Sequence, residues 1–374
     1  MPDDLVLTHV DLGQVFGAGV VARAARYERF FYVDWLLAQL ALLVTLALYA
    51  RRGIAFAKES AAGPMGTGML LGMLGLGIVW LVGLPFGLAA HWWERHNGQS
   101  KLGYVDWALQ GWATLAAEFL SVCLALVIVM GLARKLGERW WLPGAAVFVA
   151  IGAFFTFVSP YLDFTTDPLK HQALLASARE YESELGVGRI PIRVEKVSDD
   201  TDQVNAYAYG VGPSRRVVVW DTLLRRPFTE DERRVVLAHE LGHHSQHHIP
   251  KGIAWFALFA IPGAWLLMRA TRRRGGMGTP EAVPLALLVV AVLQLTAAPL
   301  SNTISRRMEA EADWKALEVT RDPAALEGVM RNFSSTSLED PDPPLWTQLM
   351  LGTHPSLAAR VAMAQAWQAA HASP

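Results

Sequence analysis

The stretch Ala238-His239-Glu240-Leu241-Gly242-His243 places two imidazoles and a carboxylate at the spacing that a metal-dependent hydrolase needs. On an α-helix, residues four positions apart lie on the same face, so His239 and His243 can each present a ring nitrogen to one zinc ion. Glu240 flanks that position and can take a proton from a water that the metal has made more acidic. The spacing therefore predicts a zinc site with Glu240 as the general base of a hydrolysis.

The helix that carries this motif has a clear beginning in the sequence. Thr229 followed three residues later by Glu232 is typical of a capping box, and an apolar run at helical spacing follows between Val235 and Leu241. The motif is therefore expected in the middle of a helix. A solvated polar helix end is the alternative interpretation, because three more histidines follow: His244, His247 and His248.

A catalytic zinc site uses three protein ligands and a water, so two histidines leave the ion under-coordinated. A third histidine at the metzincin spacing would fall on Ile249, so the third ligand must come from elsewhere. In the segment Ser305–Asp313, Glu309 and Asp313 lie on one helical face. Glu309 is the candidate ligand, and Asp313 can accept the free ring N–H of a ligating histidine. A charged juxtamembrane helix explains the same residues without a metal.

The composition indicates a membrane protein. Of the 374 residues, 52% are hydrophobic and only 18% are charged, which is low for a soluble chain. The net charge of −1 gives no reason to expect binding to nucleic acid. The single cysteine, Cys123, excludes an intrachain disulfide and a thiolate zinc site, so histidine and carboxylate must hold any metal. Asp3 and Asp4, without a basic n-region, argue against a cleaved signal peptide.

Six segments are long and apolar enough to cross a bilayer, which takes about 20 helical residues. Tryptophans near the segment ends, such as Trp92 and Trp140, are typical of the membrane interface. The fifth segment is the shortest and contains Pro262, which weakens its assignment. The predicted spans are approximately 31–50, 67–90, 113–133, 142–162, 253–268 and 282–300.

Two polar stretches remain, one between the fourth and fifth spans and one after the sixth. The first predicts a helix at 171–185, extended runs at 190–197, 204–209 and 216–220, and then the motif helix; the second is mostly helical. We therefore expect a mainly α protein, a multi-pass transmembrane bundle of about six spans with a discontinuous, zincin-like α+β unit. The expected domains are a membrane domain at 1–162 and a zinc metallopeptidase domain at 163–374, interrupted by the spans at 253–268 and 282–300.

Several ordered blocks give the chain a family resemblance. It resembles the integral-membrane zinc metalloproteases of the type I CaaX prenyl endopeptidase family, whose bacterial relatives include a heat-shock membrane protease. The blocks span most of the chain from the second predicted span onward, and their order is highly specific. They are Gly83-Leu84-Pro85, Asn205-Ala206-Tyr207, the run from Val217 to Leu223, the motif from His239 to His243, the segment from Ser305 to Asp313, and Thr353-His354-Pro355 with Arg360.

The resemblance implies that His239, His243 and Glu309 bind one zinc ion and that Glu240 is the catalytic base. It also implies that the strand Asn205-Ala206-Tyr207 binds the substrate backbone as an added edge strand.

His354 and Arg360 match family positions near the scissile carbonyl, where they are expected to stabilise the oxyanion. Considered without the family, a helix-capping histidine and a solvated arginine are the favoured interpretations of these two residues.

With six spans, both polar stretches lie on one face of the membrane. The resemblance places this face in the cytoplasm, in a multi-pass inner-membrane protein. The charge pattern does not decide the orientation, because basic residues flank the spans on both faces.

We therefore expect a zinc metalloendopeptidase embedded in the lipid bilayer that hydrolyses hydrophobic, membrane-associated or prenylated (CaaX-like) substrates. A quality-control protease that degrades misfolded membrane proteins is an alternative within the same class. A non-catalytic metal-binding membrane scaffold or transporter is an alternative from another class, although Glu240 and Glu309 are both present.

Overall fold

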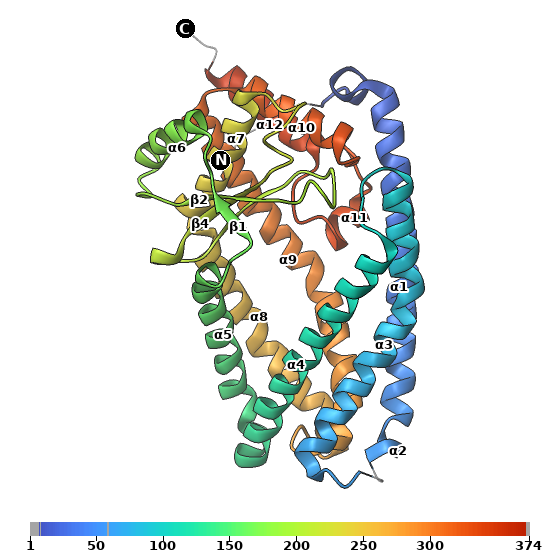
Figure 1. Cartoon of the computed structure of the whole chain (residues 1–374). Helices are drawn as coiled ribbons and strands as arrows, with labels where there is room; N and C mark the ends of the chain where they lie inside the picture. The colour runs from blue at the N-terminus through green and yellow to red at the C-terminus, as the bar shows by residue number, and fades with distance from the viewer. Residues whose placement is uncertain (1–6, 8, 58–59, 372–374) are drawn as a thin grey trace.

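Long helices dominate the protein, and a small mixed unit covers one end of them (Figure 1). The computed structural model describes residues 7, 9–57 and 60–371, so Asp3 and Asp4 lie outside the described residues. A short π-helical turn at Gly13–Gly17 precedes the first long helix. The long helices are α1 (Ala18–Arg52), α3 (Gly63–His96), α4 (Tyr104–Leu136), α5 (Trp141–Val158), α8 (His248–Thr271) and α9 (Val283–Thr320).

Within the described residues, five helical segments are long and apolar enough to cross a membrane. The third of them, Tyr104–Tyr161, contains both α4 and α5, which are joined at a 3₁₀ turn, Gly137–Trp140. The chain reverses direction at this turn, so α4 and α5 cross the bundle separately (Figure 1). Large apolar side chains such as Leu40 and Leu120 are 61% and 74% exposed, as lipid-facing positions should be. The fold class expected from the sequence is confirmed.

The small unit lies at the end of the bundle that carries both polar stretches (Figure 1). Strand β1 contains only three residues and was not expected, because so short a run has no readable alternation. Between α1 and α3 lies the short helix α2 (Ile54–Ala57). The elements of the small unit are β1 (Thr166–Pro168), α6 (Gln172–Glu184), β2 (Ile192–Glu195), β3 (Ala206–Tyr209), β4 (Arg216–Trp220), α7 (Glu230–Ser245), α10 (Pro323–Thr336), α11 (Leu345–Met350) and α12 (Leu357–His371).

The four strands form one sheet in the order β1-β2-β4-β3. β2 and β4 are parallel, whereas the other two pairs are antiparallel. β4 is central, and its Val217 and Val218 are fully buried. β3 pairs with β4 in a register that sets Ala206 opposite Val219, and among the described strands it has no neighbour on its other side. An edge strand of this kind presents backbone groups that can pair with another chain.

The core of the small unit joins the sheet to α6, α7, α10 and α12. Leu237, Leu241 and Leu357 are almost completely buried there, and burial of such side chains contributes roughly 1.5–3 kcal/mol each. Val10 and Phe16, from the beginning of the chain, belong to the same core. The division into residues 1–162 and 163–374 stays a prediction.

Helix α9 runs without a break from the membrane bundle into the small unit (Figure 1). The sequence suggested a span ending near residue 300 and a separate helix from 305, but the structure has one helix of 38 residues with Pro299 inside it. Glu309 and Asp313 therefore stand on the same rigid element that crosses the bilayer.

The capping box at the start of α7 is present. Thr229 Oγ1 accepts a hydrogen bond from the Glu232 backbone N–H at 3.3 Å, and Glu232 Oε2 accepts one from the Thr229 N–H at 2.8 Å. Glu232 Oε2 also accepts from Asn332 Nδ2 at 2.9 Å, which ties α7 to α10.

We expect Thr229→Ala to lower the free energy of unfolding by about 0.5–2 kcal/mol, because a helix N–H loses its acceptor. Glu232→Ala should cost more, since Asn332 also loses its partner. The thermal unfolding midpoint of the detergent-solubilised variants measures both effects. Asp231→Ala is the control, because the ion pair of Asp231 with Arg234 is exposed. Equal midpoints for all three variants would contradict the cap.

Candidate active site

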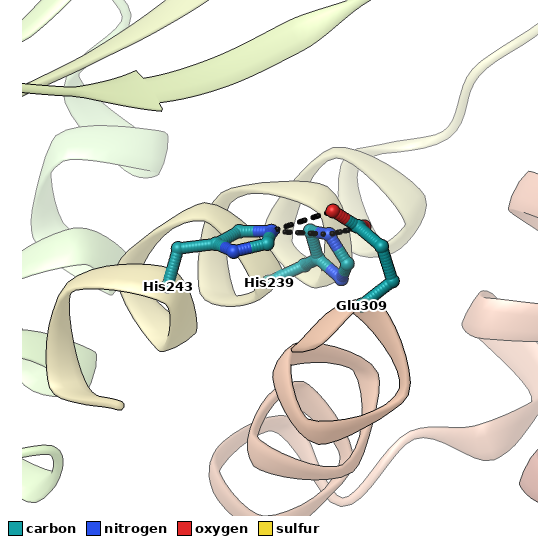
Figure 2. Close-up of side chains that lie close together, drawn as sticks. All are labelled: His239, His243 and Glu309. Carbon is teal, nitrogen blue, oxygen red and sulfur yellow. Dashed lines mark hydrogen bonds and ion pairs between the residues drawn. The ribbon is translucent and has the colours of Figure 1, made fainter. Parts of the chain in front are cut away.

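Helices α7 and α9 cross at the motif and bring three ligand-type side chains together. One atom from each of His239, His243 and Glu309 lies within 4.8 Å of the other two. Figure 2 shows the two imidazoles on one helix and Glu309 on the crossing helix, pointing toward one another. Gly242 permits this crossing, since a Cβ at that position would lie 3.2 Å from the backbone oxygen of Ala312.

The distances between these atoms suit a single tetrahedral metal ion. His239 Nε2 lies 3.1 Å from His243 Nε2 and 3.2 Å from Glu309 Oε2, and His243 Nε2 lies 3.5 Å from Glu309 Oε1. Ligand atoms about 2.0–2.1 Å from a tetrahedral zinc ion stand roughly 3.3 Å apart. Three electron-pair donors at this separation repel one another unless a proton or a metal cation lies between them. The donor set, two imidazoles and a carboxylate, is one that zinc accepts.

The second ring nitrogen of His239 is held by Asp313. His239 Nδ1 donates to Asp313 Oδ1 at 2.8 Å, so Nε2 is the ring nitrogen directed at the metal position. Asp313 is fully buried and also binds Arg360, whose Nε and Nη2 donate to its two oxygens at 2.7 and 2.6 Å. Burial disfavours a charged His239, but the carboxylates of Asp313 and Glu309 outweigh it and raise its pKa to about 10. Strong attraction for a cation is therefore built into the site.

His243 has a comparable support, which the sequence analysis did not identify. Its Nδ1 lies 2.9 Å from His248 Nδ1, and His248 Nε2 lies 3.3 Å from Glu311 Oε2. His248 is 5% exposed, although it had appeared to be part of a solvated histidine run. His247, at a φ of 56°, makes the turn that begins α8 and returns His248 toward the site. Helical spacing does not predict the contact between His243 and His248, because the turn at His247 lies between them.

Glu240 faces a cavity beside the two ligand histidines. Its side chain is 5% exposed and has no hydrogen-bond or ion-pair partner within the described part of the chain. Burial raises the pKa of the Glu240 carboxyl, and the neighbouring His239 and His243 oppose this. A carboxylate with a raised pKa accepts a proton more readily at neutral pH.

The cavity also receives residues from the C-terminal segment. His354 lines it, and its Nε2 lies 3.3 Å from Glu309 Oε2. Its side chain is 54% exposed, so it remains open to an incoming group. Arg360 lines the same cavity, but its guanidinium donates hydrogen bonds to the carboxylate of Asp313. The structure therefore brings both predicted residues to the site, in different roles.

The predicted substrate strand lies at the rim of this cavity. Asn205 and Ala206 line it together with His239 and Glu240. Tyr207 has its hydroxyl directed elsewhere, since it donates to Glu195 Oε2 at 3.1 Å within the sheet. Of the three residues, two therefore reach the site directly.

A helix pair that carries a His-Glu-x-x-His motif and a carboxylate in the position of a third ligand, attached to a bundle of membrane-spanning helices, defines a membrane metallopeptidase. Comparison with known families agrees. The Peptidase family M48 model matches residues 171–368, more than half of the chain, and the chain belongs to this family.

Three similar proteins are proteases by name, and one of them is named a metalloprotease. The "Uncharacterized metalloprotease YhfN" of Bacillus subtilis is 27% identical over 304 residues, covering 77% of this chain and 71% of the relative. The "Protease HtpX homolog" of Ligilactobacillus salivarius is 26% identical over 200 residues (47% and 67%). The "CAAX prenyl protease 1 homolog" of Arabidopsis thaliana is 30% identical over 173 residues, covering 42% of this chain and 39% of the relative.

The crystal structure of S. mikatae Ste24p has the same fold. It superposes with a TM-score of 0.77 at 20% identity, covering 95% of this chain and 91% of that chain. The protein is a membrane metalloprotease, and the resemblance seen in the sequence is confirmed.

Proposed function

We propose that His239, His243 and Glu309 hold one zinc ion and that the protein hydrolyses peptide bonds in hydrophobic, membrane-associated chains. The observation that supports this is the convergence of three donor atoms from α7 and α9, with His239 fixed by Asp313. When bound, zinc polarises the scissile carbonyl and lowers the pKa of the attacking water.

The side chains around the site transfer protons, stabilise the developing charge and orient the ligands. Glu240 takes the proton of the attacking water and returns it to the nitrogen of the leaving amine. His354 donates a hydrogen bond to the carbonyl oxygen as negative charge develops there. Arg360 keeps Asp313 charged and in place, and His248 with Glu311 keeps the ring of His243 oriented.

The substrate is held at two places. Its backbone pairs with the free edge of β3 near Asn205 and Ala206, which supplies affinity without regard to sequence. An apolar wall on the other side of the cavity takes a hydrophobic side chain beside the bond that is cut. Its members come from α7 and α10: Val235, Val236, Leu326, Val329 and Phe333.

Two substrate classes fit this site, prenylated CaaX-like peptides and misfolded membrane proteins. The names of two relatives, a CAAX prenyl protease and an HtpX protease, correspond to one class each. The test is incubation of the purified protein with a farnesylated CaaX peptide and with an unfolded membrane protein, with and without chelator. Zinc binding without cleavage of either substrate would favour the non-catalytic scaffold or transporter.

We place the small unit on the cytoplasmic face of the inner membrane, as the family resemblance implies. The exposed residue Asp199 offers a labelling position, and Cys123→Ser removes the native thiol. In intact cells, Cys123→Ser/Asp199→Cys should react with an impermeant maleimide only after permeabilisation. Labelling of intact cells would contradict the assignment.

We expect one zinc ion per chain. Elemental analysis of the purified protein measures it, and loss of both His239 and His243 should abolish it, because only Glu309 remains as a ligand. His247→Asn is the matched control, since His247 belongs to the same histidine run but its ring forms a hydrogen bond with the Ser245 carbonyl and lies outside the ligand set. A double variant that keeps its zinc would refute the ligand set.

A further inference from the structure

A second cavity, of about 290 Å³, lies close to the active site and is here named the arginine pocket. It is formed where the start of α1, the loop after α3, the loop before α7 and the end of α10 meet. Its lining includes Arg23, Gln99, Arg225, Arg226 and Thr336. No role in the proposed hydrolysis has been given to any of these residues.

The pocket carries uncompensated positive charge. Arg225 is paired with Asp221 at 2.7 Å, and the lining residue Asp202 is paired with Lys101. Arg23 and Arg226 are exposed and have no hydrogen-bond or ion-pair partner among the residues that the structure describes. Two guanidinium groups are therefore left for an anion from outside, and guanidinium binds carboxylates well because of its fork of donors.

The wall of the pocket includes a buried amide. Gln99 is 4% exposed, and its Nε2 donates to the Thr336 carbonyl at 2.9 Å, which joins the loop after α3 to the end of α10. The two arginines then attract a negative group, and a peptide supplies one as a carboxylate.

The position of the pocket points to the substrate as its occupant. Asn205 lines the active-site cavity, and the preceding residue, Val204, lines the arginine pocket. On α10, Val329 lines the first cavity and Thr336 the second, seven residues or about 10 Å further along the helix. An extended peptide covers about 10 Å with three residues. A chain paired with β3 would thus reach the arginines about three residues from the cut bond.

We propose that the arginine pocket is a substrate subsite that binds a carboxylate of the peptide, about three residues from the bond that is cut. The carboxylate belongs either to an acidic side chain or to the free C-terminus of the substrate. The inference rests on the proposed function and adds a charge preference to a site otherwise lined by apolar groups.

The first experiment incubates the zinc-loaded protein with unfolded casein as the probe and maps the cut sites by mass spectrometry. Around the most frequent cut, peptides are made with Glu or Gln at the third residue on either side. A second set ends at the third residue with a free or an amidated C-terminus. We expect kcat/KM to be about tenfold higher for the charged member of one pair. That pair identifies the source of the carboxylate.

In the double variant Arg23→Gln/Arg226→Gln, the ratio of kcat/KM between the charged and the neutral peptide should fall to about one. The variant Arg26→Gln should preserve this ratio. Arg26 lies one turn further along α1 and does not line the pocket. A ratio near one in the wild-type protein, or an undiminished ratio in the double variant, would overturn the proposal. So would activity that depends on phosphatidylglycerol through these arginines without any peptide preference, which would indicate a lipid headgroup.

Binding of the same peptides to the zinc-loaded Glu240→Gln variant, measured by fluorescence anisotropy, tests the pocket without turnover. A tenfold difference in Kd between charged and neutral peptides supports the subsite, and equal Kd values refute it. Failure of the proposed function is recognised separately, because the wild-type protein would then cut no casein, or would cut it in the presence of chelator.

Discussion

Glu240→Gln is expected to retain one zinc ion per chain and to lose peptide cleavage by about 10²–10⁴-fold, the usual contribution of a general acid–base group. Glutamine has nearly the same shape as glutamate, so the buried cavity is preserved, but it cannot take a proton from water. Glu240 is not among the atoms that converge on the metal position, so zinc binding should be unaffected. Initial rates on one peptide and zinc content on the same preparation provide the measurement.

Glu309→Gln separates the two carboxylates. Loss of a charged ligand should reduce both zinc content and activity, whereas Glu240→Gln should reduce activity alone. Glu318→Gln serves as the control, because Glu318 is exposed on the same helix and pairs with Lys315. Activity of Glu240→Gln within about tenfold of wild type would remove Glu240 from the mechanism.

The sequence predicted the parts of the site that depend on local spacing. His239 and His243 are four residues apart, and a helix between Thr229 and the histidine run follows from its cap, so their common face could be derived. Glu309 and Asp313 could be paired by the same arithmetic. That they meet His239 depends on the crossing of α7 and α9. The sequence offered Glu309 and Asp313 as candidates beside an interpretation without a metal, and the family resemblance favoured the candidates.

Other features could not be derived because they arise from long-range packing. Arg360 was expected near the scissile carbonyl, yet its guanidinium is bound to Asp313, 47 residues away in sequence. His248 reaches His243 only because the backbone turns at His247. The sequence also did not predict that α9 continues through Pro299, because proline usually breaks a helix. In a membrane bundle, neighbouring helices can satisfy the backbone groups that the proline frees.

The contacts of Asp313 combine two functions that a sequence cannot separate. One carboxylate orients a predicted zinc ligand and neutralises a buried arginine, so a single substitution disturbs both the metal and the fold. Removing one partner of a buried ion pair costs about 3–5 kcal/mol, because the other charge is left without compensation. Removing both partners costs much less. The two functions can therefore be tested by different combinations of substitutions.

Asp313→Ala should weaken zinc affinity by about 10–100-fold, because His239 loses the acceptor that fixes its ring. It should also lower the free energy of unfolding by about 3–5 kcal/mol, since Arg360 remains buried and unpaired. The double variant Asp313→Ala/Arg360→Met should regain most of the stability but none of the zinc affinity. Competition with a zinc chelator and thermal unfolding of the same detergent-solubilised samples measure the two quantities.

The double variant decides between the two roles of Asp313. If recovery of stability also restored zinc affinity, the loss of metal in the single variant would be a consequence of disturbed folding alone. If zinc affinity stays low while the unfolding midpoint recovers, the carboxylate acts on the metal through His239. Arg360→Met alone completes the comparison, because it leaves the His239–Asp313 hydrogen bond in place and should therefore lose less zinc affinity than Asp313→Ala.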